Sequence, residues 1–100
     1  MLITRLASLS SVTYIDLALN KLTGAIPAAF CGMKKLHTLY LYDNHLRGDV
    51  PALPFDQYRY CGIGTSKKTG TGNLFCTPLP KGALACNREG PVKTTGACLA

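Results

Sequence analysis

Four cysteines in the C-terminal part of the chain are the side chains with the most evident chemistry. They are Cys61, Cys76, Cys86 and Cys98. Even neighbouring members of this set are well separated along the chain, so the close C-x-x-C pair of structural zinc sites is missing. We therefore predict disulfide bonds and no metal site. Four cysteines allow three pairings, and the spacing does not choose among them. The fifth, Cys31, we expect to be a half-buried free thiol or the partner of a cysteine further upstream.

Residues that could support catalysis are few and scattered. The chain has two histidines, His37 and His45, and lacks a Ser-His-Asp order and an H-E-x-x-H motif. Its glycine pairs are not flanked by the strand and helix that a nucleotide-binding loop requires. The sequence also places no base beside Cys31 to activate it as a nucleophile. We therefore predict a protein that is not an enzyme and binds no cofactor.

Two stretches of the sequence superimpose at a constant offset. One runs from Val12 to Pro27 and the other from Leu36 to Pro51, with apolar, Asn, Gly and Pro residues at the same places in both. A repeat of about 20 to 29 residues with this pattern indicates a solenoid, in which each unit buries its apolar face against the next. We predict a partial first unit and two full units in residues 1–55, followed by a cysteine-rich cap in residues 56–100.

The repeated residues resemble plant-type leucine-rich repeats, whose consensus is L-x-x-L-x-L-x-x-N-x-L-x-G-x-I-P. The pattern is filled once by Val12, Ile15, Leu17, Asn20, Leu22, Gly24, Ile26 and Pro27, and again by Leu36, Leu39, Leu41, Asn44, Leu46, Gly48, Val50 and Pro51. The resemblance covers residues 2–53. It implies an α/β solenoid with short parallel strands on a concave face, 24-residue units and an irregular, disulfide-bearing C-terminal cap. Such units occur in receptor-like proteins and in inhibitors.

The residue types of each unit indicate how one coil is built. Alternating apolar and polar residues in the middle of each unit predict a short strand that is buried on one face. Asn20 and Asn44 follow these strands, and we predict a structural asparagine ladder, because a buried amide both donates and accepts hydrogen bonds. Gly24 and Gly48 suit a bend with positive φ. Residues 28–35 read as a short helical or 3₁₀ segment.

The leucine pattern ends after Leu53. Residues 62–73 are rich in Gly, Thr, Ser and Lys, and they predict a loop. Charge also changes here: residues 57–100 carry six Lys/Arg and one Glu, whereas residues 1–56 carry five Lys/Arg and four Asp. An alternative function follows from this imbalance, namely that residues 57–100 act as a small basic disulfide-rich peptide that binds acidic surfaces.

Cysteine content and the start of the repeat bear on location. Five cysteines in 100 residues indicate an oxidising compartment, so we expect an extracellular or cell-surface protein. No stretch reaches the roughly 18 apolar residues of a membrane span, and residues 1–11 carry no recognisable secretory signal. Leu2 and Ile3 fall opposite Ile26 and Pro27, within a preceding unit. We therefore expect the C-terminal end of a longer leucine-rich repeat protein, or a truncated relative of one.

The concave strand face is the predicted binding surface. Its predicted ligand-binding residues are Tyr14, Asp16, Ala18, His37, Tyr40, Tyr42 and Asp43, with Thr13, Leu19 and Thr38 exposed beside them. Tyrosine is enriched at interfaces because it joins an apolar ring to a polar tip. We predict a non-enzymatic recognition module, part of a receptor-like or inhibitor protein, with a protein, peptide or glycan partner and no nucleic acid.

Overall fold

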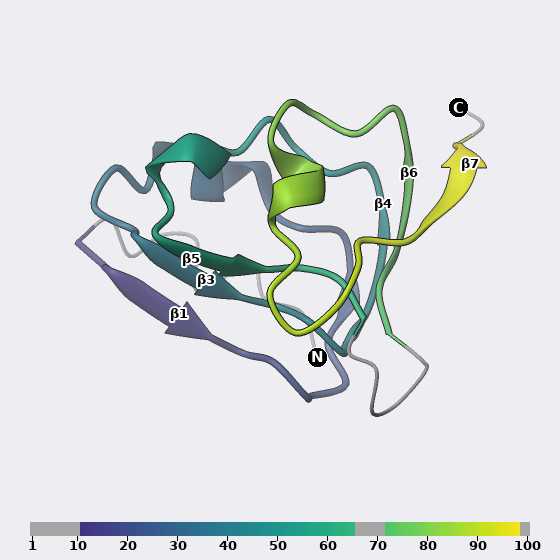
Figure 1. Ribbon diagram of the computed structural model, residues 1–100, viewed down its shortest axis with the longest axis horizontal. Coiled ribbons are helices and arrows are strands. Elements are labelled where there is room, and N and C mark those ends of the chain that lie inside the picture. Colours follow the sequence, from purple (N-terminus) through teal and green to yellow (C-terminus); the bar gives the residue numbers. More distant parts are fainter. Residues whose placement is uncertain (1–10, 66–71, 99–100) are drawn as a thin grey trace.

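Two parallel sheets run side by side through the computed structural model, which describes residues 11–65 and 72–98 (Figure 1). The predicted partial first unit therefore lies mostly outside the described residues, as do residues 66–71 of the predicted loop. The strands of one sheet are β1 (Tyr14–Asp16), β3 (Thr38–Tyr40) and β5 (Tyr60–Gly62), in that order. Those of the other are β2 (Thr23–Gly24), β4 (His45–Gly48), β6 (Leu74–Thr77) and β7 (Thr94–Ala97).

The first sheet shows that a third coil stacks on the two predicted ones. Ile15 pairs in register with Leu39, at the offset that the repeat predicts. Leu39 in turn pairs with Cys61, so the third strand follows after a slightly shorter length of chain. Strand pairing thus continues beyond residue 55, where the sequence pattern placed the start of the cap, and the boundary between repeats and cap stays a prediction.

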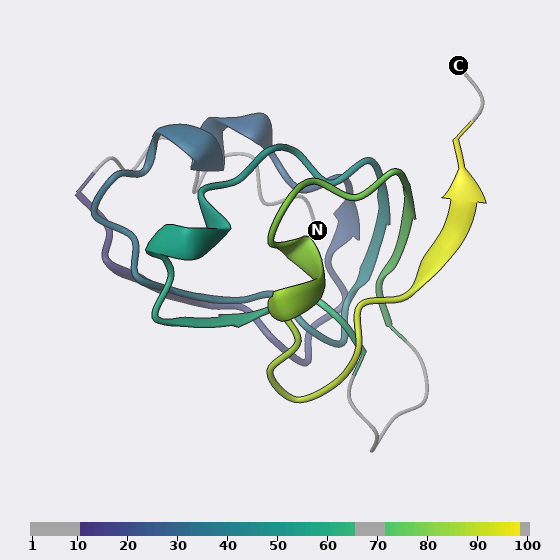
Figure 2. The same cartoon turned by 45° about the horizontal axis from the view of Figure 1, so that its top comes forward.

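Short 3₁₀ helices lie on the side of the coils away from the first sheet (Figure 2). They are η2 (Ala28–Gly32), η3 (Phe55–Gln57) and η4 (Ala83–Ala85). The expected helical segment over residues 28–35 is confirmed by η2, although it is shorter than predicted. All helical elements of the described residues are of this 3₁₀ type, and none is long and apolar enough to cross a membrane.

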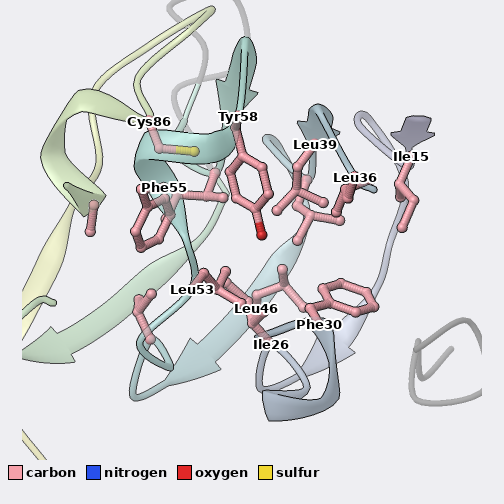
Figure 3. Close-up of a cluster of buried hydrophobic side chains, with 14 of the residues drawn as sticks. Ile15, Ile26, Phe30, Leu36, Leu39, Leu46, Leu53, Phe55, Tyr58 and Cys86 are labelled. Carbon is pink, nitrogen blue, oxygen red and sulfur yellow. The ribbon is translucent and has the colours of Figure 1, made fainter. Parts of the chain in front are cut away.

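The core fills the space between the strands and the 3₁₀ helices (Figure 3). Its fully buried members include Leu22, Phe30, Met33, Leu36, Leu39, Leu41, Leu46, Ile63 and Phe75. Each coil contributes side chains at equivalent places, so removing one coil would expose the face of its neighbour. Gly24 and Gly48 adopt φ values of 85° and 92°, which confirms the predicted left-handed bend at both repeats.

Asparagine side chains join successive coils. Asn44 donates from Nδ2 to the carbonyls of Leu41, in its own coil, and Leu17, in the preceding coil. Its Oδ1 accepts a hydrogen bond from the Leu22 amide, so one side chain satisfies backbone groups of two coils. Asn20 is exposed, and among the described residues it bonds only within its own coil, from Nδ2 to the carbonyls of residues 17 and 18.

A third asparagine, Asn73, repeats the pattern of Asn44. Its Nδ2 donates to the carbonyls of Leu41 and Ile63, at 2.7 and 2.9 Å, and its Oδ1 accepts from the amide of Leu46. The prediction of a loop over residues 62–73 is wrong at Gly62, which is the last residue of β5. Gly62 and Ile63 belong to the third coil, and Asn73 is fully buried. The repeat pattern does not identify Asn73, because an insertion separates this residue from the strand of its coil.

Two disulfide bonds hold the C-terminal part against the last coils. They join Cys61 to Cys86 and Cys76 to Cys98, with Cα–Cα distances of 4.7 and 5.3 Å. The first bond brings residues 86–91 against the outer edge of β5, where Gly62 forms an antiparallel bridge with Asn87. This segment also closes the exposed edge of the sheet, because the Arg88 amide donates to the Cys61 carbonyl and the Ile63 amide to the Cys86 carbonyl.

Tyr58 places a hydroxyl inside the core (Figure 3). Its side chain is 8% exposed, and its oxygen has no hydrogen-bond partner among the described residues. Burial, and to a lesser extent the charge of the Cys31 thiolate, raises the pKa of Tyr58 from 10.0 to about 12. The folded protein therefore holds this proton more tightly than the unfolded chain does.

Removing this hydroxyl is expected to change how stability depends on pH. Below pH 10 the phenol is neutral in both states, whereas between pH 10 and 12 only the unfolded chain releases the proton. With allowance for solvent screening, the native protein should lose about 1–2 kcal/mol as pH rises through this range, and Tyr58→Phe should escape that loss. Urea unfolding at pH 8 and 11.5 measures the free energy of unfolding of the wild type and of Tyr58→Phe. The control is Tyr60→Phe, which removes the hydroxyl of an exposed tyrosine. A Tyr58→Phe stability that follows the wild type at both pH values would contradict the assignment.

Candidate functional site

The outer face of the β1–β3–β5 sheet, here called the strand face, presents side chains in rows that run across the strands. Parallel register places Tyr14, Thr38 and Tyr60 in one row. It places Asp16, Tyr40 and Gly62 in the next row. Because a strand alternates its two faces, the residues between these rows point into the core. The face therefore repeats across three coils.

Tyrosines dominate this face. Tyr14 and Tyr40 contact edge to face, with ring centroids 6.3 Å apart, and Tyr40 meets Tyr42 in the same way at 6.0 Å. Tyr14 is 56% exposed, whereas Tyr40 and Tyr42 are partly buried. Edge-to-face packing holds aromatic rings upright against one another and reduces the rotamer freedom lost on binding. The predicted residues Tyr14, Tyr40 and Tyr42 are thus brought together.

Negative charges act on the phenol of Tyr42. The pKa of the Tyr42 phenol is raised above its usual value, first by burial and then by nearby negative charges. These charges belong to Glu89, Asp16 and Asp43, in decreasing order of effect, with a smaller contribution from Tyr40. The Asp16 carboxylate is held by a hydrogen bond from the Ala18 amide, at 3.2 Å, and remains exposed.

Two predicted positions on this face are not exposed. Thr38 is 1% exposed because it lies in the central strand between two tyrosines, Tyr14 and Tyr60, of the same row. Asp43 is 7% exposed because the third coil covers it, and its amide donates to the Gly64 carbonyl. The expectation that these two side chains are exposed is therefore wrong, although the charge of Asp43 still reaches Tyr42.

The other predicted positions lie at the ends of the strands. His37 is exposed at the start of β3, where its Nδ1 is 2.9 Å from the hydroxyl of Thr38. Ala18 is partly buried beside the Asp16 carboxylate. Leu19 is 62% exposed and has a φ of 58°, a left-handed conformation that leucine rarely adopts. We find no structural reason for a leucine at this position.

Two residues of this face escaped the sequence analysis. Tyr60 is 43% exposed, and the guanidinium of Arg88 lies over its ring, 5.0 Å from the centroid. The spacing Tyr58-x-x-Cys61-x-Ile63 could have revealed Tyr60, because it repeats the consensus with an aromatic residue and a cysteine in place of leucines. Glu89 had no local signal, since it reaches the face only through the fold of residues 86–91.

Among the described residues, the cysteines form two structural disulfide bonds and leave one free thiol. Cys31 is a free, exposed thiol, rather than the half-buried one we expected, and it contacts the Ala52 carbonyl at 3.4 Å. Asp49, Cys76 and Cys98 bring possible metal-ligand atoms within 4.8 Å of one another. Two of these atoms are the sulfurs of one disulfide, however, so the group is not a metal-ligand set.

A hollow of about 440 Å³ lies away from the strand face, between η3 and η4. Phe55 and Gly82 form part of its wall, with Asp56 and Lys81 at its sides. It lacks aligned tyrosines and repeats no feature of the stacked coils. Its size alone does not indicate a ligand, so the strand face is the better candidate site.

Residues 57–65 and 72–98 are integrated into the stack rather than forming a separate unit. Strand β5 pairs with β3, strand β6 pairs with β4, and Asn73 donates to a carbonyl of the second coil. The basic tail therefore shares the core and backbone hydrogen bonds of the repeats. This arrangement does not favour the alternative in which the tail acts alone as a small peptide.

Comparisons with known proteins agree with this geometry. Residues 5–46 match a family model described as leucine rich repeat. The chain is 41% identical over 44 residues to Receptor-like protein 52 of Arabidopsis thaliana, which is 44% of this chain and 5% of that protein. It is 42% identical over 43 residues to a probable leucine-rich repeat receptor-like serine/threonine-protein kinase of the same species, which is 43% of this chain and 4% of the kinase.

A solved structure shares the fold. One chain in the crystal structure of the BIR3–SERK2 complex from Arabidopsis thaliana superimposes with a TM-score of 0.61 and 24% sequence identity. The match covers 88% of this chain and 44% of that one. This chain spans only about one twentieth of the curated relatives that it matches, so their remaining parts have no counterpart in the comparison.

Proposed function

We propose that this chain, whose repeats are leucine-rich repeats similar to those of plant receptor-like proteins, is a non-enzymatic recognition module that binds a protein or peptide partner. The observation that carries this proposal is the cluster of packed tyrosines, Tyr14, Tyr40 and Tyr42, on the strand face, which corresponds to the concave face of such repeats. Rigid aromatic side chains on a regular sheet bind at a low cost in conformational entropy. By likeness to its relatives, the module works at the cell surface or outside the cell.

The relatives support a protein partner without identifying it. Both curated relatives are named as receptor-like proteins, and the structural neighbour was solved in a complex of two proteins. The two disulfide bonds fit an oxidising, extracellular setting. We therefore expect the partner to be a secreted or cell-surface protein or peptide.

Replacing Tyr40 and Tyr42 together by alanine is expected to weaken partner binding by about 10- to 100-fold, because central aromatic residues carry most of the binding free energy of an interface. The full chain, immobilised, would capture partners from the extracellular fluid of its source organism, and mass spectrometry would identify them. The affinity of each captured partner would then be measured for wild type and variant.

The matched control changes two exposed residues outside the strand face, Lys34 and Lys35, which follow η2, to alanine. This variant is expected to bind as the wild type does. Equal binding by the tyrosine variant would refute the strand face as the binding surface. Loss of binding only in the lysine variant would instead support recognition by the basic charges of the chain.

A further inference from the structure

The distribution of acidic residues points to the chemistry of the partner. The chain has 11 Lys and Arg residues but only five Asp and Glu residues. Three of these five gather near Tyr42. Asp16 pairs in register with Tyr40, whose ring contacts that of Tyr42, and Asp43 follows Tyr42 in the chain. Glu89 follows Arg88, whose carbonyl lies against Gly62 beside the Tyr42 ring, and the three charges together raise the pKa of Tyr42. They come from β1, from the turn after β3 and from the C-terminal segment. Among the described residues, this gathering of acidic groups in a chain of net charge +6 is a property of the fold and not of the composition.

The backbone brings these groups together at a position where a side chain is missing. A Cβ atom at Gly62 would lie 2.6 Å from the Arg88 carbonyl oxygen and 3.2 Å from the Tyr42 ring. Glycine thus lets the segment that carries Glu89 come against the tyrosines. The Cys61–Cys86 disulfide holds the start of this segment in place.

The same sheet already contains the interaction that we infer. Arg88 stacks over the exposed ring of Tyr60, with its guanidinium carbon 5.0 Å from the ring centroid. A planar guanidinium interacts favourably with the face of an aromatic ring and with carboxylates at its edge. Tyr40 and Tyr42 offer aromatic rings of the same kind, and these rings have carboxylates beside them where Tyr60 has an arginine.

We propose that the strip formed by Asp16, Tyr40, Tyr42 and Glu89, here called the tyrosine–carboxylate strip, binds an arginine side chain from a basic segment of the partner. The proposal rests on the function proposed above and specifies the chemistry of its ligand. The exposed carboxylates of Asp16 and Glu89 neutralise the guanidinium, and the tyrosine rings contact its face. Asp43 contributes charge from beneath the surface.

Basic side chains lie at the other end of the strand face, and two of them, Arg59 and Arg88, carry a positive charge there. His37 and Arg59 occupy equivalent places just before β3 and β5, and the Arg59 amide donates to the His37 carbonyl. Arg88 covers the neighbouring ring of Tyr60. A basic partner segment would therefore be attracted to the carboxylate end and repelled from the start of the strands, which fixes the direction in which it binds.

The test uses the full chain and a short probe, the capped peptide acetyl-Gly-Arg-Gly-amide. Its control is the same peptide with citrulline, which has the shape of arginine but no charge. NMR titration at low salt should show saturable shifts of the Tyr40 and Tyr42 ring signals with the arginine peptide. The citrulline peptide should bind about tenfold more weakly or not at all.

Two double variants with equal charge distinguish the strip from general electrostatics. The pair Asp16→Asn and Glu89→Gln removes its exposed carboxylates, and the amide oxygen of the new asparagine can still accept the bond from the Ala18 amide. The pair Asp49→Asn and Asp56→Asn removes the same charge from exposed positions elsewhere. The first pair should lose about tenfold in affinity, and the second should bind as the wild type does.

Each outcome separates this inference from the function proposed above. Equal affinity in the two pairs, or shifts confined to other residues, would overturn arginine binding at the strip. If a captured protein partner depends on Tyr40 and Tyr42 but not on the two carboxylates, the recognition function stands and this inference falls. Should the first pair be poorly folded, two single variants replace it. Tyr40→Phe should bind the arginine peptide as the wild type does, and Tyr40→Leu should bind it more weakly, because arginine binding needs the ring and not the hydroxyl.

Discussion

Replacing Asn73 by alanine is expected to lower the free energy of unfolding by about 3 kcal/mol or more, whereas Asn20→Ala should cost about 1 kcal/mol or less. Asn73 is fully buried, and its loss leaves the Leu46 amide and the Ile63 carbonyl without their partner, whereas the Leu41 carbonyl keeps its bond from Asn44. Each such buried group costs about 1–3 kcal/mol when it is left unsatisfied. Asn20 is exposed, so water replaces its hydrogen bonds.

Urea unfolding of the two variants at neutral pH, followed by circular dichroism, measures this difference. The comparison is matched because both side chains follow a strand and donate to carbonyls of their own coil. They differ in the coil-to-coil bonds that Asn73 makes. Similar losses in both variants would mean that the bonds between coils contribute little, and that the stack is held by its apolar core alone.

Asn73 also shows what the sequence pattern predicts and where it fails. Asn44 follows Leu41 at the interval that the consensus requires, and its role was predicted from that spacing. Asn73 follows Ile63, the equivalent of Leu41, after a much longer interval, so the consensus pattern does not reach it. The hydrogen bonds are nevertheless the same, because a solenoid fixes the position of the amide and not the length of chain that leads to it.

The strand face was also predicted from the regular spacing of the repeats. The errors in that prediction, at Asp43 and Glu89, have a common cause. Period and register follow from local sequence, so Tyr14, Asp16 and Tyr40 were placed correctly on one face. The burial of Asp43 and the position of Glu89 near Tyr42 depend on segments that lie far away in the sequence. Such contacts carry no local signal, and only the folded arrangement of the third coil and of residues 86–91 reveals them.

Replacing Cys61 and Cys86 together by alanine is expected to cost about 3.5 kcal/mol in the free energy of unfolding, because the bond restricts the unfolded chain. The two residues are 25 positions apart, and cross-linking a loop of that length lowers the entropy of the unfolded chain accordingly. Thermal and urea unfolding of the oxidised wild type and the double variant would measure the loss. For a chain of 100 residues, this is a large part of the roughly 5–15 kcal/mol that stabilises a typical domain.

The second disulfide is the control that separates entropy from native contacts. Cys76 and Cys98 are 22 positions apart, so the entropy argument predicts almost the same cost for removing either bond. Only the Cys61–Cys86 bond, however, holds residues 86–91 against the edge of β5. We therefore expect its removal to cost more than removal of the Cys76–Cys98 bond, and to weaken binding of the arginine peptide because Glu89 moves away. Equal stabilities and unchanged peptide affinity would show that the backbone bonds from Arg88 and Ile63 position this segment without the disulfide.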